Sequence, residues 1–214
     1  MMFMEHLLQS NDFLAIINKH RRAINVTPIL HSTPIPITED CSLPAFDIID
    51  NNNGGPIIRP QGSGTAHYFN SPQEPLRNMR FIEYENFINS LPQDYNHEWS
   101  RADFIAYDTS PCKSYFIIHE LTEGTFQNKR TDAIRQMQNT LMRLYECAQI
   151  KNYIQLFQNK WCILSATGGA QQAPLDMTAG FNVIYAKLPD PEPLNANIIE
   201  RRGFKAWRTL NVKL

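Results

Sequence analysis

The sequence lacks several features that would assign it to a protein class at once. Its 4 cysteines form no C-x-x-C pair and have no histidine at zinc-ligand spacing. It also lacks any run of the ~18 apolar residues needed to span a bilayer. The amino terminus, MMFMEHLLQSNDFL, carries acids and no basic leader, which argues against a cleaved secretory signal. We therefore expect a cytoplasmic protein with reduced thiols and no membrane span.

Charge is scarce and nearly balanced. Lysine and arginine total 20 against 21 aspartate and glutamate, and charged residues make up 19% of the chain, which is typical of a folded protein slightly poor in charge. The two halves differ, because residues 1–100 carry 6 basic against 11 acidic residues and residues 101–214 carry 14 against 10. The second half is thus the better candidate for contact with a phosphate backbone, although its excess charge is a weak signal.

A chain of 214 residues suits one large domain or a domain with an appendage. We expect residues 1–70 to form an N-terminal helix and a proline-rich extended arm, and residues 71–214 to form the core with a basic tail. Ser10 is a plausible cap for a helix over residues 12–22. The prolines between residues 26 and 60 exclude long helices and leave short extended pieces, such as residues 46–49.

The Gly62-x-Gly64 pair, in a loop over residues 60–64, is not expected to bind phosphate. A glycine-rich phosphate cradle needs a strand before it and a helix after it. Neither is indicated by the surrounding sequence.

Residues 101–144 form the most informative stretch, because isolated acids interrupt apolar runs there. Residues 102–107 and 115–121 read as two strands joined by a turn. A hairpin folded about Pro111 and Cys112 places Asp103 opposite Glu120. Period-two alternation puts His119 on the other face, where we expect a hydrogen-bonded packing residue.

Two opposed carboxylates repel each other unless a cation lies between them. Mg²⁺ takes oxygen ligands, often from one or two carboxylates together with water and substrate phosphates. We therefore expect Asp103 and Glu120 to be metal ligands. The alternative is that one strand end is solvated and the two acids never meet; a register shift of one residue would place them on opposite faces.

The residues before this hairpin predict a helix. Phe81, Tyr84, Ile88 and Leu91 repeat at helical spacing, which indicates a helix over residues 81–91. Glu85 lies beside that stripe. It is either a solvated neighbour or a third carboxylate that reaches the site.

After the hairpin, a second helix is expected from residue 128 onwards, with Ile134, Met137, Leu141 and Leu144 as its core stripe. Its remaining faces carry Lys129, Arg135 and Gln138, which either hold a phosphate or form a solvated face.

Three further elements follow in the second half. We expect a helical turn over residues 150–157 and strands over residues 161–166 and 181–186. The tail holds Arg201, Arg202 and Lys205, interleaved with aromatic residues. That pattern is typical of a nucleic-acid contact, and equally of an edge strand with charged outward residues.

Together, the acid in a hairpin strand, the run Ile-Ile-His-Glu-Leu-Thr and a following helix with basic and glutamine residues resemble the PD-(D/E)xK nuclease superfamily, over about residues 71–186. The resemblance implies Mg²⁺ held by Asp103 and Glu120, a further carboxylate from Glu85, and Lys129 as a catalytic residue. It also implies nucleic-acid contacts from the basic residues and amide named above, which are Arg135, Gln138, Arg201, Arg202 and Lys205.

Thr122 stands where the family has its lysine. A neutral hydroxyl cannot stabilise developing negative charge as an ammonium does. Either Lys129 or Arg135 reaches into the site from the next helix, or the site is degenerate and the fold serves binding.

The predicted fold is α/β, a mixed central sheet of at least four strands flanked by helices on both faces, with a restriction-endonuclease-like core. The predicted function is metal-dependent phosphodiester hydrolysis of DNA or RNA. The alternative is a non-catalytic interaction or scaffold subunit of a larger assembly, such as a defence complex or a phage particle, with a protein as its partner.

Overall fold

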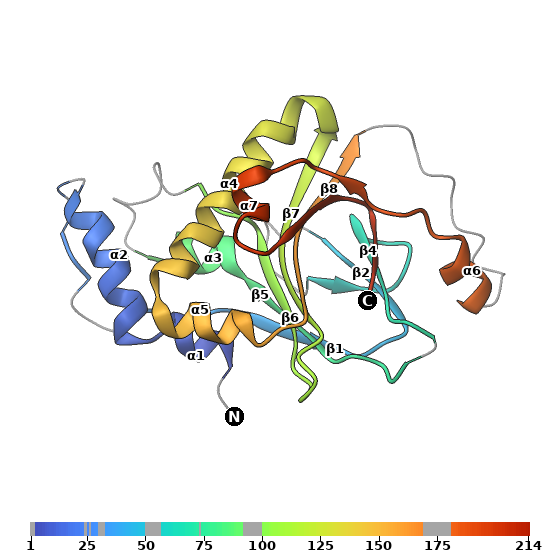
Figure 1. Cartoon of the computed structure of the whole chain (residues 1–214), viewed down its shortest axis with the longest axis horizontal. Coiled ribbons are helices and arrows are strands. Elements are labelled where there is room, and N and C mark those ends of the chain that lie inside the picture. Colours follow the sequence, from blue (N-terminus) through green and yellow to red (C-terminus); the bar gives the residue numbers. More distant parts are fainter. Residues whose placement is uncertain are drawn as a thin grey trace.

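The computed structural model describes residues 3–23, 25, 27–29, 33–49, 57–72, 74–91, 100–168 and 181–214. Figure 1 shows a layer of helices on one side of a long sheet and a smaller sheet on the other side. The helices are α1 (Met4–Leu8), α2 (Asn11–Ala23), α3 (Tyr84–Asn89), α4 (Phe126–Glu146), α5 (Ala148–Gln155), α6 (Phe181–Lys187) and α7 (Asn197–Glu200). The strands are β1 (Thr38–Cys41), β2 (Ala45–Ile48), β3 (Ile58–Arg59), β4 (Ala66–Phe69), β5 (Met79–Glu83), β6 (Phe104–Asp108), β7 (Tyr115–Thr125), β8 (Asn159–Gly168), β9 (Glu192–Pro193), β10 (Lys205–Arg208) and β11 (Asn211–Lys213).

The larger sheet has seven strands in the part of the chain that the structure describes, in the order β1-β5-β6-β7-β8-β10-β9. Strands β5, β6 and β7 pair antiparallel, whereas β7 pairs parallel with β8 and β8 with β10. Helices α4 and α5 make the crossover between β7 and β8. The predicted α/β fold with a mixed central sheet is therefore confirmed.

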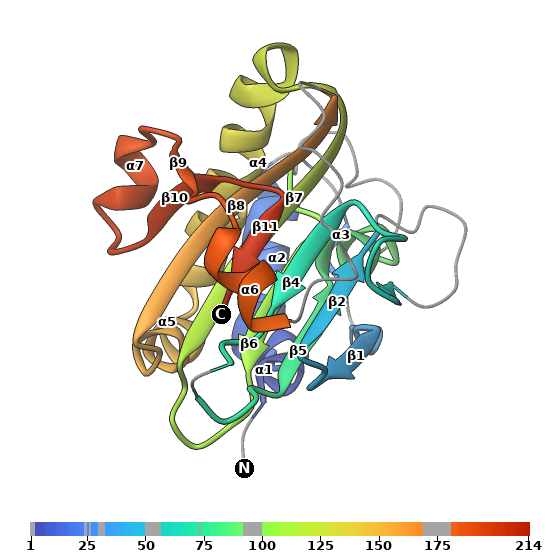
Figure 2. The ribbon, with the colours of Figure 1, turned by 90° about the vertical axis from the view of Figure 1, so that its right-hand side faces the viewer.

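The two faces of this sheet are covered differently. Ile105 and Tyr107 of β6 pack in the cluster formed with the helices, whereas Phe104 and Ala106 pack in a second cluster with β2 and β4. Those two strands belong to a sheet ordered β11-β4-β2-β3, which Figure 2 shows in front of the main sheet with α2, α4 and α5 behind it. The expected helix layer on both faces is thus wrong, because a sheet covers the second face.

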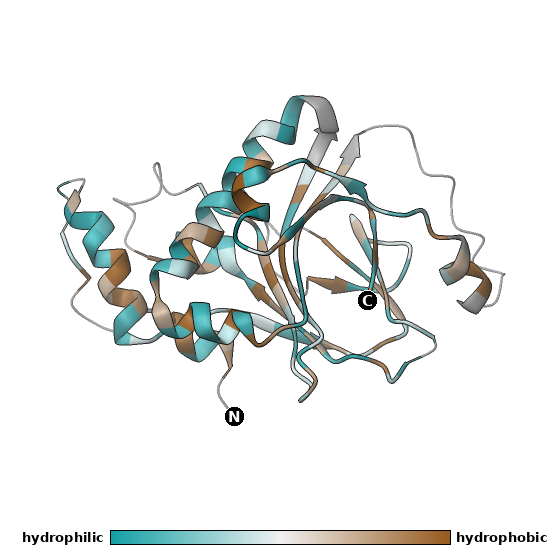
Figure 3. Cartoon of the chain, in the orientation of Figure 1, coloured by the Kyte–Doolittle hydropathy of each residue, from teal (hydrophilic) through white to brown (hydrophobic). Residues whose placement is uncertain are grey.

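The hydropathy of the chain follows this layering. Figure 3 shows hydrophobic stretches along the central strands and mostly hydrophilic residues on the outer side of α4. The core side of α4 carries Met137, Leu141 and Leu144, as expected, but Ala133 is buried there while Ile134 is only partly buried.

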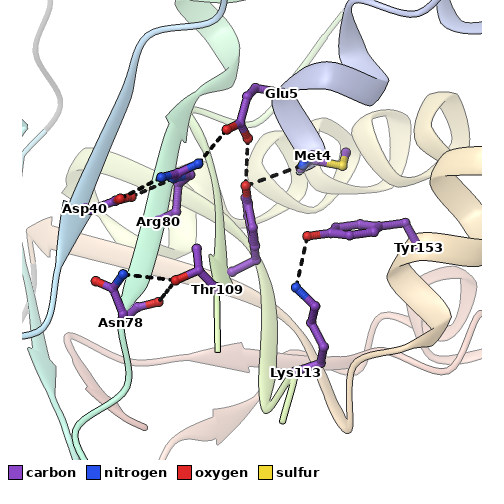
Figure 4. Close-up of polar contacts among 9 residues, drawn as sticks. Met4, Glu5, Asp40, Asn78, Arg80, Thr109, Lys113 and Tyr153 are labelled. Atoms are coloured by element: carbon purple, nitrogen blue, oxygen red, sulfur yellow. Dashed lines mark hydrogen bonds and ion pairs between the residues drawn. The ribbon is translucent and has the colours of Figure 1, made fainter. Parts of the chain in front are cut away.

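The N-terminal elements join the main sheet through a polar network (Figure 4). Glu5 of α1 accepts hydrogen bonds from Tyr107 Oη and from Arg80, both at 2.6 Å. Arg80 also binds Asp40 of β1 through two nitrogens, at 2.6 and 2.7 Å. These bonds connect α1, β1, β5 and β6.

Two expectations for residues 1–70 are borne out. Ser10 Oγ accepts the Phe13 N–H at 3.2 Å and so caps α2, and the extended piece expected over residues 46–49 corresponds to β2. In the glycine loop, the Asp47 carboxylate accepts the N–H groups of Ser63 and Gly64 at 2.8 and 2.9 Å. The donors that a phosphate would need are therefore satisfied internally. The domain boundary expected after residue 70 stays a prediction.

Two expected elements are wrong. The helix over residues 81–91 begins only at Tyr84, because Met79 and Phe81 face the small sheet while Ile82 faces the helices, and this alternation belongs to strand β5. The strand expected over residues 181–186 is helix α6, whose Ile184 packs with Phe69. The turn over residues 150–157 and the strand over 161–166 are confirmed as α5 and β8.

Candidate functional site

The hairpin has the register expected from its turn. Phe104 lies opposite His119, and Tyr107 lies opposite Phe116. Asp103 directly precedes β6, so it takes the next register position, opposite Glu120, on the face that packs against the helices. Both residues are buried, with exposed fractions of 6% and 5%.

The Asp103 carboxylate also serves the local structure. Its Oδ2 accepts a hydrogen bond from the Leu121 N–H at 2.6 Å, and its backbone carbonyl accepts the Glu85 N–H at 3.1 Å. Asp103 therefore joins the start of α3 to β7, which brings Glu85 to the same end of the hairpin as Glu120.

A cavity of about 430 Å³ lies where β7 ends, between α3 and the first turns of α4. A crossover between parallel strands leaves such a crevice beyond the carboxyl ends of the strands, where α/β proteins commonly bind ligands. Its lining residues are Glu85, Ser100, Arg101, Glu120, Thr122, Lys129, Asp132, Ala133, Arg135 and Gln136. The cavity thus combines Glu85, Glu120, Lys129 and Arg135 from the predicted site with Thr122.

The charges in this cavity are partly compensated. Arg101 lies 3.4 Å from Glu85 in an ion pair, and Arg135 lies 2.9 Å from Asp132. Lys129 is exposed and forms no ion pair with any residue that the structure describes. Of the cations that line the cavity, Lys129 is therefore the one whose charge is least neutralised by a carboxylate of the protein.

The other predicted site residues lie elsewhere. Asp103 and Gln138 are not among the lining residues of the cavity. Arg201 and Arg202 line a separate groove, and Lys205 is exposed on β10.

Sequence reasoning did not find Ser100 or Arg101 in the site. The ion pair that holds Arg101 to Glu85 joins two different elements, so no spacing along the chain reveals it.

Carboxylate oxygens are the type of ligand that Mg²⁺ prefers, but these carboxylates do not form a complete set of ligands for it. Among the residues that the structure describes, no group of three or more His, Cys, Asp or Glu side chains is arranged to hold a metal ion. Mg²⁺ commonly uses one or two carboxylates and completes its shell with water and substrate oxygens. Glu120 lines the cavity, whereas Asp103 does not, and Glu85 is already paired with Arg101.

His119 lies on the opposite face, as predicted, in a buried hydrogen-bonded chain. Ser165 Oγ donates to the Thr209 carbonyl at 2.6 Å, so it accepts from His119 Nε2, 2.9 Å away. The Nδ1 atom is then the acceptor for Tyr68 Oη at 2.7 Å. Complete burial lowers the pKa of His119 to about 3, which keeps the ring neutral and makes it a packing residue.

Comparison with known proteins does not place the chain in a family. No protein-family model, curated protein or solved structure matches it. Of the helices in the described ranges, none has the length and apolar character required to cross a membrane.

Proposed function

We propose that the protein hydrolyses phosphodiester bonds of nucleic acid with the help of a divalent metal ion, at the cavity beyond β7. The observation that carries this proposal is the gathering of Glu85, Glu120, Thr122 and Lys129 around one cavity. The hairpin register, which pairs Phe104 with His119 and so makes Asp103 and Glu120 the next opposed positions, supports it further. The resemblance to PD-(D/E)xK nucleases gives the same residues these roles.

Each residue would act according to its position. Asp103 and Glu120 would hold Mg²⁺, which when bound acidifies water and neutralises charge on a phosphodiester. Lys129, at the exposed rim, would stabilise the negative charge that develops on the phosphate, because Thr122 carries no charge. Arg101 orients Glu85 through their ion pair.

The direct test measures cleavage of labelled single- and double-stranded DNA and RNA with Mg²⁺ or Mn²⁺. We expect Glu120→Gln to lower the cleavage rate by about 100-fold or more, since it removes a carboxylate at the reacting centre. Asp132→Asn is the matched control, because Asp132 lines the same cavity but pairs with Arg135 at its exposed rim. Cleavage that survives Glu120→Gln would refute the assignment.

Metal binding gives a readout that does not depend on turnover. Added Mn²⁺ should raise the melting temperature of the wild type, because a ligand that binds only the folded state stabilises it. The same shift in Glu120→Gln would place the ion somewhere else.

A second candidate function is a non-catalytic interaction subunit that keeps this fold as a scaffold. Three observations favour it: Asp103 accepts a backbone hydrogen bond, Glu85 is paired with Arg101, and no three-ligand group occurs in the described ranges. This candidate predicts neither cleavage nor metal-dependent stabilisation under any condition above. Metal-dependent cleavage of any one substrate, if Glu120→Gln abolishes it, would exclude the non-catalytic function.

A further inference from the structure

A second hollow, of about 700 Å³, lies at the C-terminal end of α4, whereas the candidate site lies beside its N-terminal half. The walls of this groove come from α4, α5, the start of β8 and the turn after α7. Figure 1 shows α7 beside α4, with α5 continuing from the end of α4. The groove therefore collects side chains from segments that are far apart in the sequence.

Four of its lining residues are cations: Lys151, Lys160, Arg201 and Arg202. Within the described ranges, none of them forms an ion pair with a carboxylate. Lys160 Nζ donates to the Phe157 carbonyl at 2.9 Å, and Arg202 donates to the Ile198 carbonyl at 3.1 Å, but a neutral carbonyl leaves the charge uncompensated. Cations gathered in this way repel one another and favour an anionic ligand.

The acid that lines the groove does not offset this charge. Glu146 is held by Arg143 and His20, both at 2.9 Å, and by Lys19 at 3.8 Å. Burial pushes the pKa of Glu146 upwards, but hydrogen bonds from His20 and Arg143 outweigh it and leave the pKa below its usual value. Glu146 is thus a carboxylate already shared among three neighbours.

The remaining wall indicates what kind of anion fits. Tyr145 is partly buried, and its ring is held edge-on against Phe204 with the centroids 6.2 Å apart. The Lys151 ammonium lies 6.0 Å from the Tyr145 ring centroid. A fixed aromatic ring beside arginine and lysine suits a ligand that alternates phosphates with flat or sugar groups.

We propose that this groove binds the phosphodiester backbone of a nucleic acid. The proposal deepens the proposed function and rests on it for the identity of the ligand, since it assigns the groove to the same substrate as the cavity. Asp132 in the cavity and Tyr145 in the groove are about 20 Å apart along the axis of α4, at 1.5 Å a residue. A ligand that reaches both sites must therefore span about that distance, as a polynucleotide does.

The test measures binding of a fluorescein-labelled oligonucleotide by anisotropy, in EDTA to prevent cleavage, at sodium chloride concentrations between about 50 and 200 mM. We expect Arg201→Ala/Arg202→Ala to lower the affinity for single strands by about tenfold or more. The slope of log K against log salt should become shallower by about 1.4, because two phosphate contacts are lost.

Two control variants separate groove contacts from net charge and from misfolding. Arg59→Ala removes a charge from a partly exposed residue of β3 that lies outside the groove, and it should leave the salt slope unchanged. Arg201→Lys/Arg202→Lys keeps both charges and should retain most of the slope. Thermal unfolding confirms that each variant is folded.

Each outcome separates the groove from the cavity. An unchanged slope in the double alanine variant, an equal change in Arg59→Ala, or no binding to any oligonucleotide overturns the groove proposal. If the double alanine variant binds more weakly but neither the wild type nor any variant cleaves nucleic acid, the groove binds nucleic acid and the proposed function fails. Cleavage that Glu120→Gln abolishes, with binding unaffected by the groove variants, supports the function and refutes the groove.

Discussion

Thr122 is the residue on which the proposed chemistry of the cavity depends. It lines the cavity with Glu120 and Lys129, two positions after Glu120 on the same face of β7. The proposed nuclease function would be served by a lysine at that position. The structure thus puts Thr122 inside the candidate site rather than beside it.

A lysine placed at position 122 provides a first prediction. Thr122→Lys should raise metal-dependent cleavage by about tenfold or more, because an ammonium group would then lie beside the developing charge. Lys129→Ala should lower cleavage strongly in the wild type and weakly in the Thr122→Lys background, and rates of the two single variants and the double variant measure this coupling. Thr122→Ser is the matched control. Equal effects of Lys129→Ala in both backgrounds would show that Lys129 does not replace the lysine.

A second prediction at the residue scale concerns pH. The pKa of His119 falls to about 3 in the folded protein, against about 6.5 in an unfolded chain. The unfolded state therefore binds a proton that the folded state does not, and stability falls as the pH drops from about 6.5 towards 3.

Urea unfolding at pH 7 and pH 5 measures this effect. The wild type should lose about 2 kcal/mol more than His119→Gln over that interval, because glutamine does not titrate there. Equal losses in the two proteins would mean that His119 is protonated in the folded state.

At the scale of elements, the β6–β7 hairpin decides where the acids lie, and its turn is built around Asp108. This residue is fully buried. Its carboxylate accepts the N–H groups of Ser110 and Ser114 at 2.9 and 3.0 Å, and the Ser110 hydroxyl at 2.8 Å. The side chain therefore organises the turn and, through it, the register that places Asp103 opposite Glu120.

Removing that carboxylate should destabilise the protein. Asp108→Ala leaves buried donors without an acceptor, and we expect a loss of about 3 kcal/mol in the free energy of unfolding. Asp108→Asn retains one acceptor oxygen and should lose less. Denaturant unfolding measures both variants, and an alanine variant as stable as the wild type would show that water satisfies these donors.

At the scale of the whole molecule, α1 is joined to the main sheet by the network in Figure 4. Tyr107 Oη donates to Glu5 at 2.6 Å and accepts the Met4 N–H at 3.4 Å. Burial and the neighbouring Glu5 raise the pKa of Tyr107 far above its ordinary value. The phenol thus stays protonated and keeps its donor role over the whole working pH range.

Tyr107→Phe removes both bonds without changing the packed ring. We expect a loss of about 1–3 kcal/mol, together with faster hydrogen exchange in α1 (Met4–Leu8) than in α4. Tyr145→Phe serves as the control, since its hydroxyl makes a single bond of 3.4 Å to the Arg202 carbonyl. Hydrogen exchange that becomes faster by the same factor over the whole chain would show that these bonds do not stabilise α1 locally.

The sequence by itself determined the features that depend on neighbours along the chain. The turn at Asp108 and the alternation of β7 specify the hairpin and its register. The same alternation puts the side chains of His119 and Glu120 on opposite faces of the sheet. The helical repeat of α4 and the apolar run of β8 could also be predicted from the sequence, because each segment is long enough to show its pattern.

Only the tertiary structure decided the rest. Residues 79–83 became a strand because two layers bury their opposite faces, and residues 181–187 became a helix that packs on Phe69. The Arg101–Glu85 pair and the basic groove arise from segments that meet only after folding. Short apolar segments fit a helix or a strand equally well, and contacts between distant segments leave no period in the sequence, so packing alone settles both.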